Sequence, residues 1–166
     1  YLPDRQERVA VALDPTLHSS SNYEVLLANG FRRSGDTIYK PLCQQCNACE
    51  PIRIFAHQFK PSRSQKRLLS KASGITWQLK ENMDDNWYDL YARYIEARHH
   101  LGTMYPPNRQ SFEQFSHCNW LNTQYLHLYD NEKLIAIAVT DMMSNSASAF
   151  YTFYDPDYSL SLGTLG

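Results

Sequence analysis

The sequence YLHLYDNEKLIAIAVTDMMSNSASAFYTFY, residues 125–154, contains three strand-like runs rich in apolar residues, which are Tyr125–Tyr129, Leu134–Met143 and Ala149–Tyr154. Polar turn residues separate these runs at Asp130-Asn131 and near Asn145. Strands joined by turns this short must run antiparallel, because a parallel connection needs a dozen or more residues. The stretch therefore predicts three consecutive strands of an antiparallel sheet.

Strand and helix patterns precede this sheet. In order, they predict a short strand at 75–79, a helix that starts near 83–86 and reaches His100, an extended loop at 105–107 and a second helix at 109–118. Two helices beside an antiparallel sheet favour the α+β class. Since a compact domain of this order needs at least one more helix and strand, we expect the domain to continue beyond Gly166.

The first part of the chain has a different composition. It predicts a strand at 7–13, a helix at 22–29, a hairpin at 31–40 and a basic helix that Ser62 caps and that ends near Ala72. We place a domain boundary near Ser73, which gives a cysteine-containing lobe at 1–72 and a sheet domain at 73–166. Because residue 1 is Tyr rather than Met, we expect the natural N-terminus to lie upstream.

The charge is unevenly distributed. Of the 16 Lys and Arg residues and 17 Asp and Glu residues, nine basic and two acidic residues lie in 31–72, which is +7; the remaining seven basic and fifteen acidic residues give -8. A basic block of this size predicts an anionic partner, although counter-charges from elsewhere in the fold are an alternative. The sequence has no apolar run of the length a membrane span needs and no signal-peptide pattern, so we expect a cytoplasmic protein.

Three cysteines, Cys43, Cys46 and Cys49, form a Cys-x2-Cys-x2-Cys motif. Thiolates at this spacing can surround one metal, so the motif predicts zinc or an iron–sulfur cluster; a redox-active pair is the alternative. The fourth ligand stays open among Cys118, His57 and a residue upstream of Tyr1.

Several motifs together resemble one family, the arginyl- and leucyl-tRNA–protein transferases. They are YLPDRQ at 1–6, GFRRSG at 30–35, YKP at 39–41, the cysteine motif with PIRI at 51–54, QKR at 65–67, MYPP at 104–107, AVTD at 138–141 and FYTFYDP at 150–156. The resemblance covers nearly the whole chain.

The resemblance implies an N-terminal metal-binding lobe and an acetyltransferase-like (GNAT) antiparallel-sheet domain that is C-terminally incomplete here. It also implies transfer of leucine from Leu-tRNA to the N-terminal Asp or Glu of acceptor proteins, which marks them for N-end rule degradation. In the family a further cysteine lies just before the Tyr-Leu-Pro run, and a C-terminal strand and helix follow. The alternatives are arginyl transfer, an acetyl-CoA-dependent N-acetyltransferase and a non-enzymatic tRNA- or zinc-binding module.

Aminolysis of an ester needs a neutral amine and a stabilised oxyanion more than a strong base. Asp141 ends an apolar strand, where packing does not call for a carboxylate, so we predict that it holds or deprotonates the acceptor amine. Tyr151 and Tyr154 on the next strand are candidates to donate to the carbonyl or to orient the terminal adenosine of tRNA. Each of the three has a purely structural alternative.

The basic block has two anions to bind. We assign Arg32 and Arg33 to the acidic side chain of the acceptor, with Lys40 as the next candidate, because Arg can grip a carboxylate with two hydrogen bonds. A second set lies on one predicted helix and suits tRNA phosphates, namely Lys66, Arg67 and Lys71.

Overall fold

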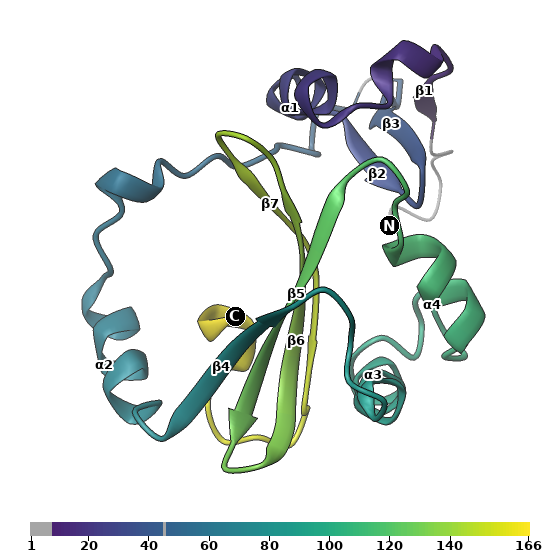
Figure 1. Cartoon of the computed structure of the whole chain (residues 1–166). Helices are drawn as coiled ribbons and strands as arrows, with labels where there is room; N and C mark the ends of the chain where they lie inside the picture. Colours follow the sequence, from purple (N-terminus) through teal and green to yellow (C-terminus); the bar gives the residue numbers. More distant parts are fainter. Residues whose placement is uncertain (1–7, 45) are drawn as a thin grey trace.

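The computed structural model describes residues 8–44 and 46–166, which form two antiparallel sheets (Figure 1). The smaller sheet has the strand order β1-β3-β2, with β1 at Val9–Ala12, β2 at Arg32–Ser34 and β3 at Thr37–Pro41. A 3-10 turn, η1 (Pro15–Leu17), and helix α1 (Ser20–Ala28) connect β1 to β2. The predicted hairpin and helix are confirmed. The predicted first strand is confirmed from Val9 onward, and its residue 7 lies outside the described residues.

The turn between β2 and β3 explains one glycine of the family motif. Gly35 has φ of 55°, and a Cβ there would lie 2.6 Å from the backbone oxygen of Gln114. The backbone N–H of Gly35 donates to the carbonyl of Phe115 over 2.7 Å. Only glycine lets the hairpin approach helix α4 (Arg109–Ser116) this closely.

The larger sheet has the order β4-β5-β6-β7, and every neighbouring pair is antiparallel. Its strands are β4 (Ile75–Lys80), β5 (Asn122–Asp130), β6 (Lys133–Met142) and β7 (Ala147–Tyr154). The three consecutive strands predicted from the sequence are therefore confirmed, and the predicted short strand at 75–79 joins them at the β5 edge.

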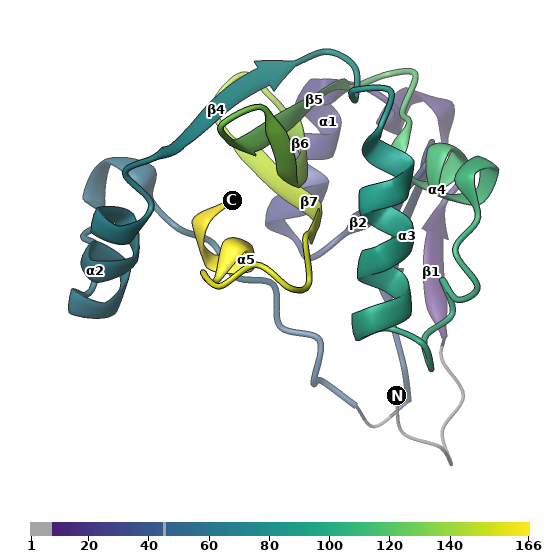
Figure 2. The same ribbon diagram turned by 90° about the horizontal axis from the view of Figure 1, so that it is seen from below.

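Helices α3 (Trp87–Arg98) and α4 cover one face of this sheet (Figures 1 and 2). The helices contribute an aromatic layer that packs on buried sheet residues, namely Trp87, Tyr91 and Phe112 on Ile137, Val139 and Phe153. The short helix α5 (Leu162–Leu165) contacts a separate buried cluster through Leu162. The α+β class follows; the GNAT assignment and the metal-binding character of the N-terminal lobe stay predictions.

A long connection joins the two sheets. It runs from Leu42 through η2 (Ala56–Gln58) to helix α2 (Arg63–Lys71), which contacts α5. Ser62 and Gln65 form a capping box, with the Ser62 hydroxyl accepting from the Gln65 N–H and the Gln65 amide oxygen accepting from the Ser62 N–H. The predicted basic helix and its cap are confirmed. The expected boundary near Ser73 falls between α2 and β4.

None of the helices in residues 8–44 and 46–166 combines the length and apolarity needed to cross a membrane.

Candidate functional site

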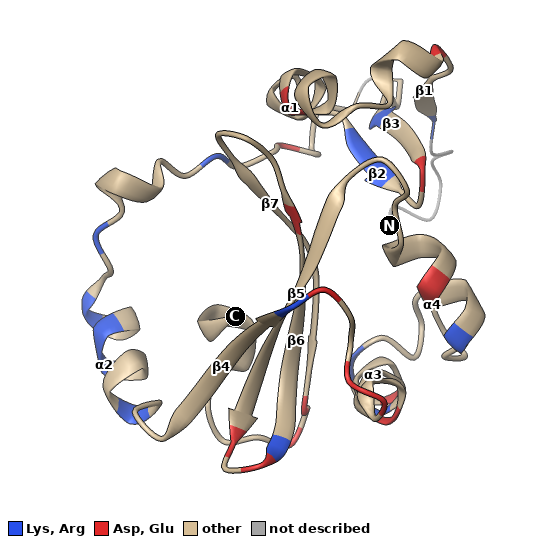
Figure 3. Ribbon diagram, in the orientation of Figure 1, with Lys and Arg blue, Asp and Glu red and all other residues tan. Residues whose placement is uncertain are grey.

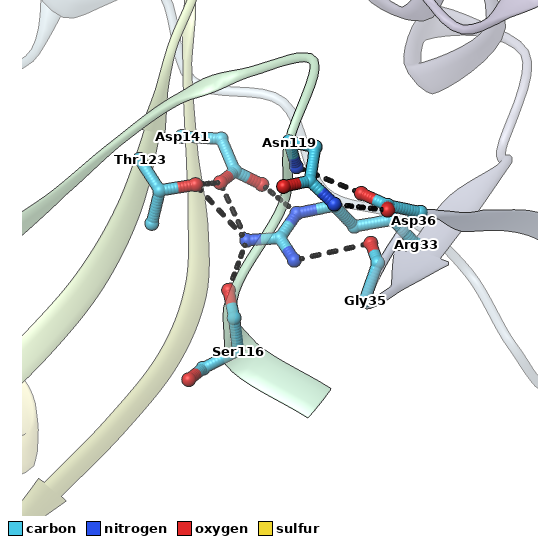
Figure 4. A network of polar contacts seen from close by, with 7 residues as sticks. All are labelled: Arg33, Gly35, Asp36, Ser116, Asn119, Thr123 and Asp141. Carbon is cyan, nitrogen blue, oxygen red and sulfur yellow. Dashed lines mark hydrogen bonds and ion pairs between the residues drawn. The ribbon is translucent and has the colours of Figure 1, made fainter. Parts of the chain in front are cut away.

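A buried ion pair lies where the two sheets meet (Figure 4). Arg33 on β2 donates from Nε and Nη2 to the two carboxylate oxygens of Asp141 on β6, each over 2.7 Å. Neither side chain is exposed to solvent. Thr123 donates its hydroxyl to Asp141 over 2.9 Å, and Arg33 also donates to the carbonyl of Ser116 over 3.0 Å. Phe150 lies 3.9 Å from the guanidinium carbon and covers the cation.

Strand alternation explains why Arg33 reaches this position. In β2 the exposed, buried and exposed residues are Arg32, Arg33 and Ser34, so the two arginines leave opposite faces of the small sheet. Asp141 stands near the end of β6, opposite Thr123 on β5 and Ser148 on β7. The ion pair gives each of the two buried charges, that of Arg33 and that of Asp141, a partner of opposite sign.

This geometry differs from two of the roles predicted from the sequence. The sequence predicts that Arg33 binds the acceptor side chain and that Asp141 binds the amine, yet each is the other's partner and neither is open to a substrate. Arg32 and Arg33 also cannot grip one carboxylate together, since they point to opposite faces. Lys40 lies on β3, where its ammonium is 5.7 Å from the centre of the Phe31 ring.

Two acidic residues of the N-terminal lobe add to the junction. Asp36 accepts from the backbone N–H of Asn119 over 2.8 Å and from its amide over 2.6 Å, and these bonds hold the pKa of Asp36 below its ordinary value. Glu24 on α1 accepts from the hydroxyl of Ser146 over 2.6 Å, which lowers the pKa of Glu24. Both carboxylates bind loops next to strands of the large sheet, so the contacts between the lobe and this sheet extend beyond the Arg33–Asp141 pair.

The two predicted catalytic tyrosines have different surroundings. Tyr151 packs against Phe115, whose ring lies 4.7 Å from Phe150, so one aromatic layer links Tyr151 to the ion pair. Burial raises the pKa of Tyr151 well above its ordinary value, which keeps the phenol protonated and able to donate. Its hydroxyl enters none of the hydrogen bonds found in the described part of the chain. Tyr154 instead packs on Tyr94 of α3 at 4.8 Å.

The three motif cysteines lie after β3. The Cys46 N–H donates to the Cys43 carbonyl over 3.4 Å, and Cys49 is exposed. Within residues 8–44 and 46–166, no three His, Cys, Asp or Glu side chains form a group able to hold a metal. The three thiols therefore do not form a ligand set in this arrangement, and the zinc or iron–sulfur site stays a prediction.

The three residues predicted to bind tRNA phosphates are all exposed on α2, namely Lys66, Arg67 and Lys71. Among the ion pairs of the described residues, none involves these three. The structure thus leaves their charges available to an external anion.

A polar cluster that the sequence does not predict lies at the β4–α3 connection. Lys80 donates to Asp84 over 2.6 Å and to the hydroxyl of Tyr129 over 2.8 Å, and Tyr129 donates to Asp84. Beneath them the fully buried His127 accepts from the Asp84 N–H over 3.2 Å, and burial lowers its pKa. Lys80, Tyr129 and Asp84 show no unusual spacing, so only their proximity reveals the cluster. Because the lysine and the carboxylate neutralise each other, the cluster suits a structural role.

Comparisons with known proteins identify the family. A sequence model described as the N terminus of arginine-tRNA-protein transferase matches residues 1–67, and one described as the C terminus matches residues 86–166. The chain belongs to this family. The resemblance noted in the sequence is therefore confirmed, and the two matched ranges contain Arg33 and Asp141, the members of the buried ion pair.

Individual relatives of this transferase family carry a more specific name. Proteins named aspartate/glutamate leucyltransferase are 65% identical in Vibrio cholerae (strain M66-2), 62% in Vibrio vulnificus (strain YJ016) and 48% in Shewanella putrefaciens. Each match covers 99% of this chain, and it covers 71%, 71% and 70% of the respective relatives.

Proposed function

We propose that this protein transfers leucine from Leu-tRNA to the N-terminal Asp or Glu of acceptor proteins and so marks them for N-end rule degradation. The observation that supports the proposal best is the 62–65% identity to proteins named aspartate/glutamate leucyltransferase along 99% of the chain. Arginine is the competing donor, because the family models carry its name.

The chemistry is aminolysis of an ester. The lone pair of the acceptor's α-amino nitrogen attacks the carbonyl carbon of leucyl-tRNA, a C–N bond forms and the C–O bond to the terminal ribose breaks. The ribose oxygen leaves with the proton that the amine gives up, so no other reactant is consumed. An α-amino group has a pKa of about 7.7–8.0, so about a quarter to two-fifths of it is already neutral near pH 7.5. Orientation of the two substrates therefore accounts for most of the required catalysis.

In this scheme Arg33 and Asp141 are positioning residues. Their ion pair holds the β2–β3 hairpin against β6, and the Phe150 ring on Arg33 packs on the layer that contains Tyr151. A phenol kept protonated by burial can donate to a developing oxyanion, and we assign that role to Tyr151. Tyr154 is the second candidate because it lies on the same strand.

The acceptor's carboxylate needs an exposed cation. Arg32 meets that requirement because it points away from the buried pair, so we keep it as the acceptor-binding candidate, with Lys40 as the alternative. The exposed bases of α2 are proposed to bind tRNA phosphates. For the cysteine motif we propose zinc or an iron–sulfur cluster in a structural role, and no step of the transfer depends on it.

The test is a transfer assay with four peptides and two donors. The protein is incubated with Leu-tRNA or Arg-tRNA and with peptides beginning Asp, Glu, Lys or Ala, and the mass of each peptide is measured. We expect a mass increase of one leucine residue on the Asp and Glu peptides only. Addition of arginine instead would show that Arg-tRNA, not Leu-tRNA, is the donor. No addition from either tRNA would refute the proposal. Acetyl-CoA with the same peptides tests the acetyltransferase alternative.

For acceptor binding, Arg32→Gln is compared with Lys40→Gln. Loss of the preference for Asp over Ala peptides in only one of the two variants identifies the residue that reads the carboxylate. If both variants keep the preference, the acceptor site lies elsewhere.

A further inference from the structure

Residues 51–80 contain seven Lys and Arg residues and no Asp or Glu. The seven are Arg53, Lys60, Arg63, Lys66, Arg67, Lys71 and Lys80. All except Lys80 are exposed, and the ribbon coloured by charge shows the blue positions along the η2–α2 segment with no red among them (Figure 3). Such a segment repels cations over its whole length and attracts a polyanion.

Helix α2 presents its cations on one side. Arg63, Lys66, Arg67 and Lys71 are spaced by three, one and four residues, so at 100° per residue they occupy a single arc of the helix. With a rise of 1.5 Å per residue, Arg63, Arg67 and Lys71 follow one another at about 6 Å along the axis. A row of exposed cations is suited to a phosphate backbone.

Two phenylalanines stand directly before this helix. Phe55 and Phe59 flank the single turn η2 as its cap residues and are 59% and 50% exposed. His57 lies between them, with its ring 6.2 Å from that of Phe55. Phenylalanine has no polar group to justify exposure to water, so two exposed rings within a cationic segment point to a ligand that offers flat apolar faces and negative charge together.

Unpaired nucleotides have this chemistry. Their bases stack on aromatic side chains while nearby cations bind the phosphates, whereas the bases of a duplex are already stacked on each other and expose only their edges. A tRNA offers both parts, a duplex stem and an unpaired 3′ end that carries the amino acid.

We propose that Phe55 and Phe59 stack on unpaired nucleotides at the 3′ end of tRNA while the cations of α2 hold the adjacent phosphates. The inference rests on the proposed function, because that function makes aminoacyl-tRNA the donor. It assigns the η2 segment the task of orienting the end of the tRNA, which is distinct from the electrostatic capture performed by α2.

The test measures dissociation constants for two RNAs, intact uncharged tRNA and the same tRNA with its unpaired 3′ nucleotides removed. Phe55→Leu/Phe59→Leu should weaken binding of intact tRNA by about tenfold or more, since base stacking on an aromatic ring contributes about 1–3 kcal/mol per base. The same variant should bind the trimmed tRNA as wild type does. Lys66→Gln/Arg67→Gln should weaken both RNAs and make log Kd less dependent on log salt concentration, by roughly 0.7–0.9 per lost contact.

Tyr105→Leu is the matched control, because this ring is 47% exposed but lies outside the basic segment; its binding should equal that of wild type. A 2-aminopurine in the unpaired 3′ end gives a second measurement on unaltered protein, and its fluorescence should fall on binding as the base stacks. Equal binding of intact tRNA by wild type and the phenylalanine variant, or equal weakening of both RNAs, would overturn the inference.

The transfer assay and the RNA-binding assay together distinguish failure of the proposed function from failure of this inference. If leucine is not transferred but the phenylalanine variant weakens binding of intact tRNA and leaves binding of trimmed tRNA unchanged, the 3′-end site stands and the reaction is reassigned. If leucine is transferred and the variant discriminates no differently from wild type, the rings have no stacking role.

Discussion

Replacing Arg33 by Met should destabilise the protein strongly. The substitution keeps much of the apolar stem but removes two 2.7 Å bonds to Asp141 and the bond to the Ser116 carbonyl. Asp141 would then be fully buried with the Thr123 hydroxyl as its remaining side-chain partner. Removal of one member of a buried ion pair costs about 3–5 kcal/mol, because the other charge stays desolvated.

The assay is urea denaturation at pH 7, followed by far-UV circular dichroism. Arg32→Met is the matched control, since it is the adjacent residue on the same strand and is exposed; its change in the free energy of unfolding should stay within about 0.5 kcal/mol. The double variant Arg33→Met/Asp141→Leu should recover part of the loss, because no charge remains buried.

A loss below about 1 kcal/mol for Arg33→Met would refute the reasoning, since it would mean that water reaches Asp141 or that the pair does not form.

The rate of leucine transfer by Asp141→Asn distinguishes a positioning role from a general-base role for Asp141. A positioning residue should lower the transfer rate and the stability together, and the pH profile should keep its shape. A general base should lower the rate alone and remove a limb of that profile.

The remaining predictions concern the same junction and the free thiols. Hydrogen bonds lower the pKa of Asp36 from its ordinary value of 3.8, so the stability it contributes is present above that value and is lost as the pH falls through the lower folded-state pKa. The difference in unfolding free energy between wild type and Asp36→Asn should therefore shrink when urea titrations move from pH 6 to pH 3, and a constant difference would contradict the assignment. Gly35→Ala should cost about 2–4 kcal/mol, because alanine would need both a positive φ and space that the Gln114 carbonyl occupies; Gly74→Ala, with nothing within 4 Å, is the control, and similar midpoints in urea would argue against the close approach. Burial raises the pKa of Cys118 to about 11, so iodoacetamide at pH 8 should modify the exposed Cys49 and spare Cys118, as read by peptide mass spectrometry.

Local patterns in the sequence were sufficient to predict most of the elements. Apolar segments separated by short polar turns predicted β5, β6 and β7, because a short turn forces neighbouring strands to pair antiparallel without reference to distant residues. Ser62 as a cap residue likewise predicted the start of α2, since the bonds that a cap makes are local. The family resemblance was carried by ordered motifs and required no structure.

In β1 the alternation of apolar residues did not predict which side chains are buried. Val9 and Val11 alternate as a strand should, yet each is 45% exposed, so the face of the small sheet that they share is not buried. A period identifies a strand and its faces, whereas the packing of other elements decides which face is buried.

Only the tertiary structure decided the roles of the charged residues. Arg33 and Asp141 are 108 residues apart, and no local rule connects β2 of one sheet to β6 of another. The sequence identified both as unusual and therefore predicted that they meet substrates. Folding instead pairs them and leaves Arg32 outside, since adjacent strand residues face opposite ways. A charge can be recognised in a sequence, but its partner depends on which surfaces the fold brings together.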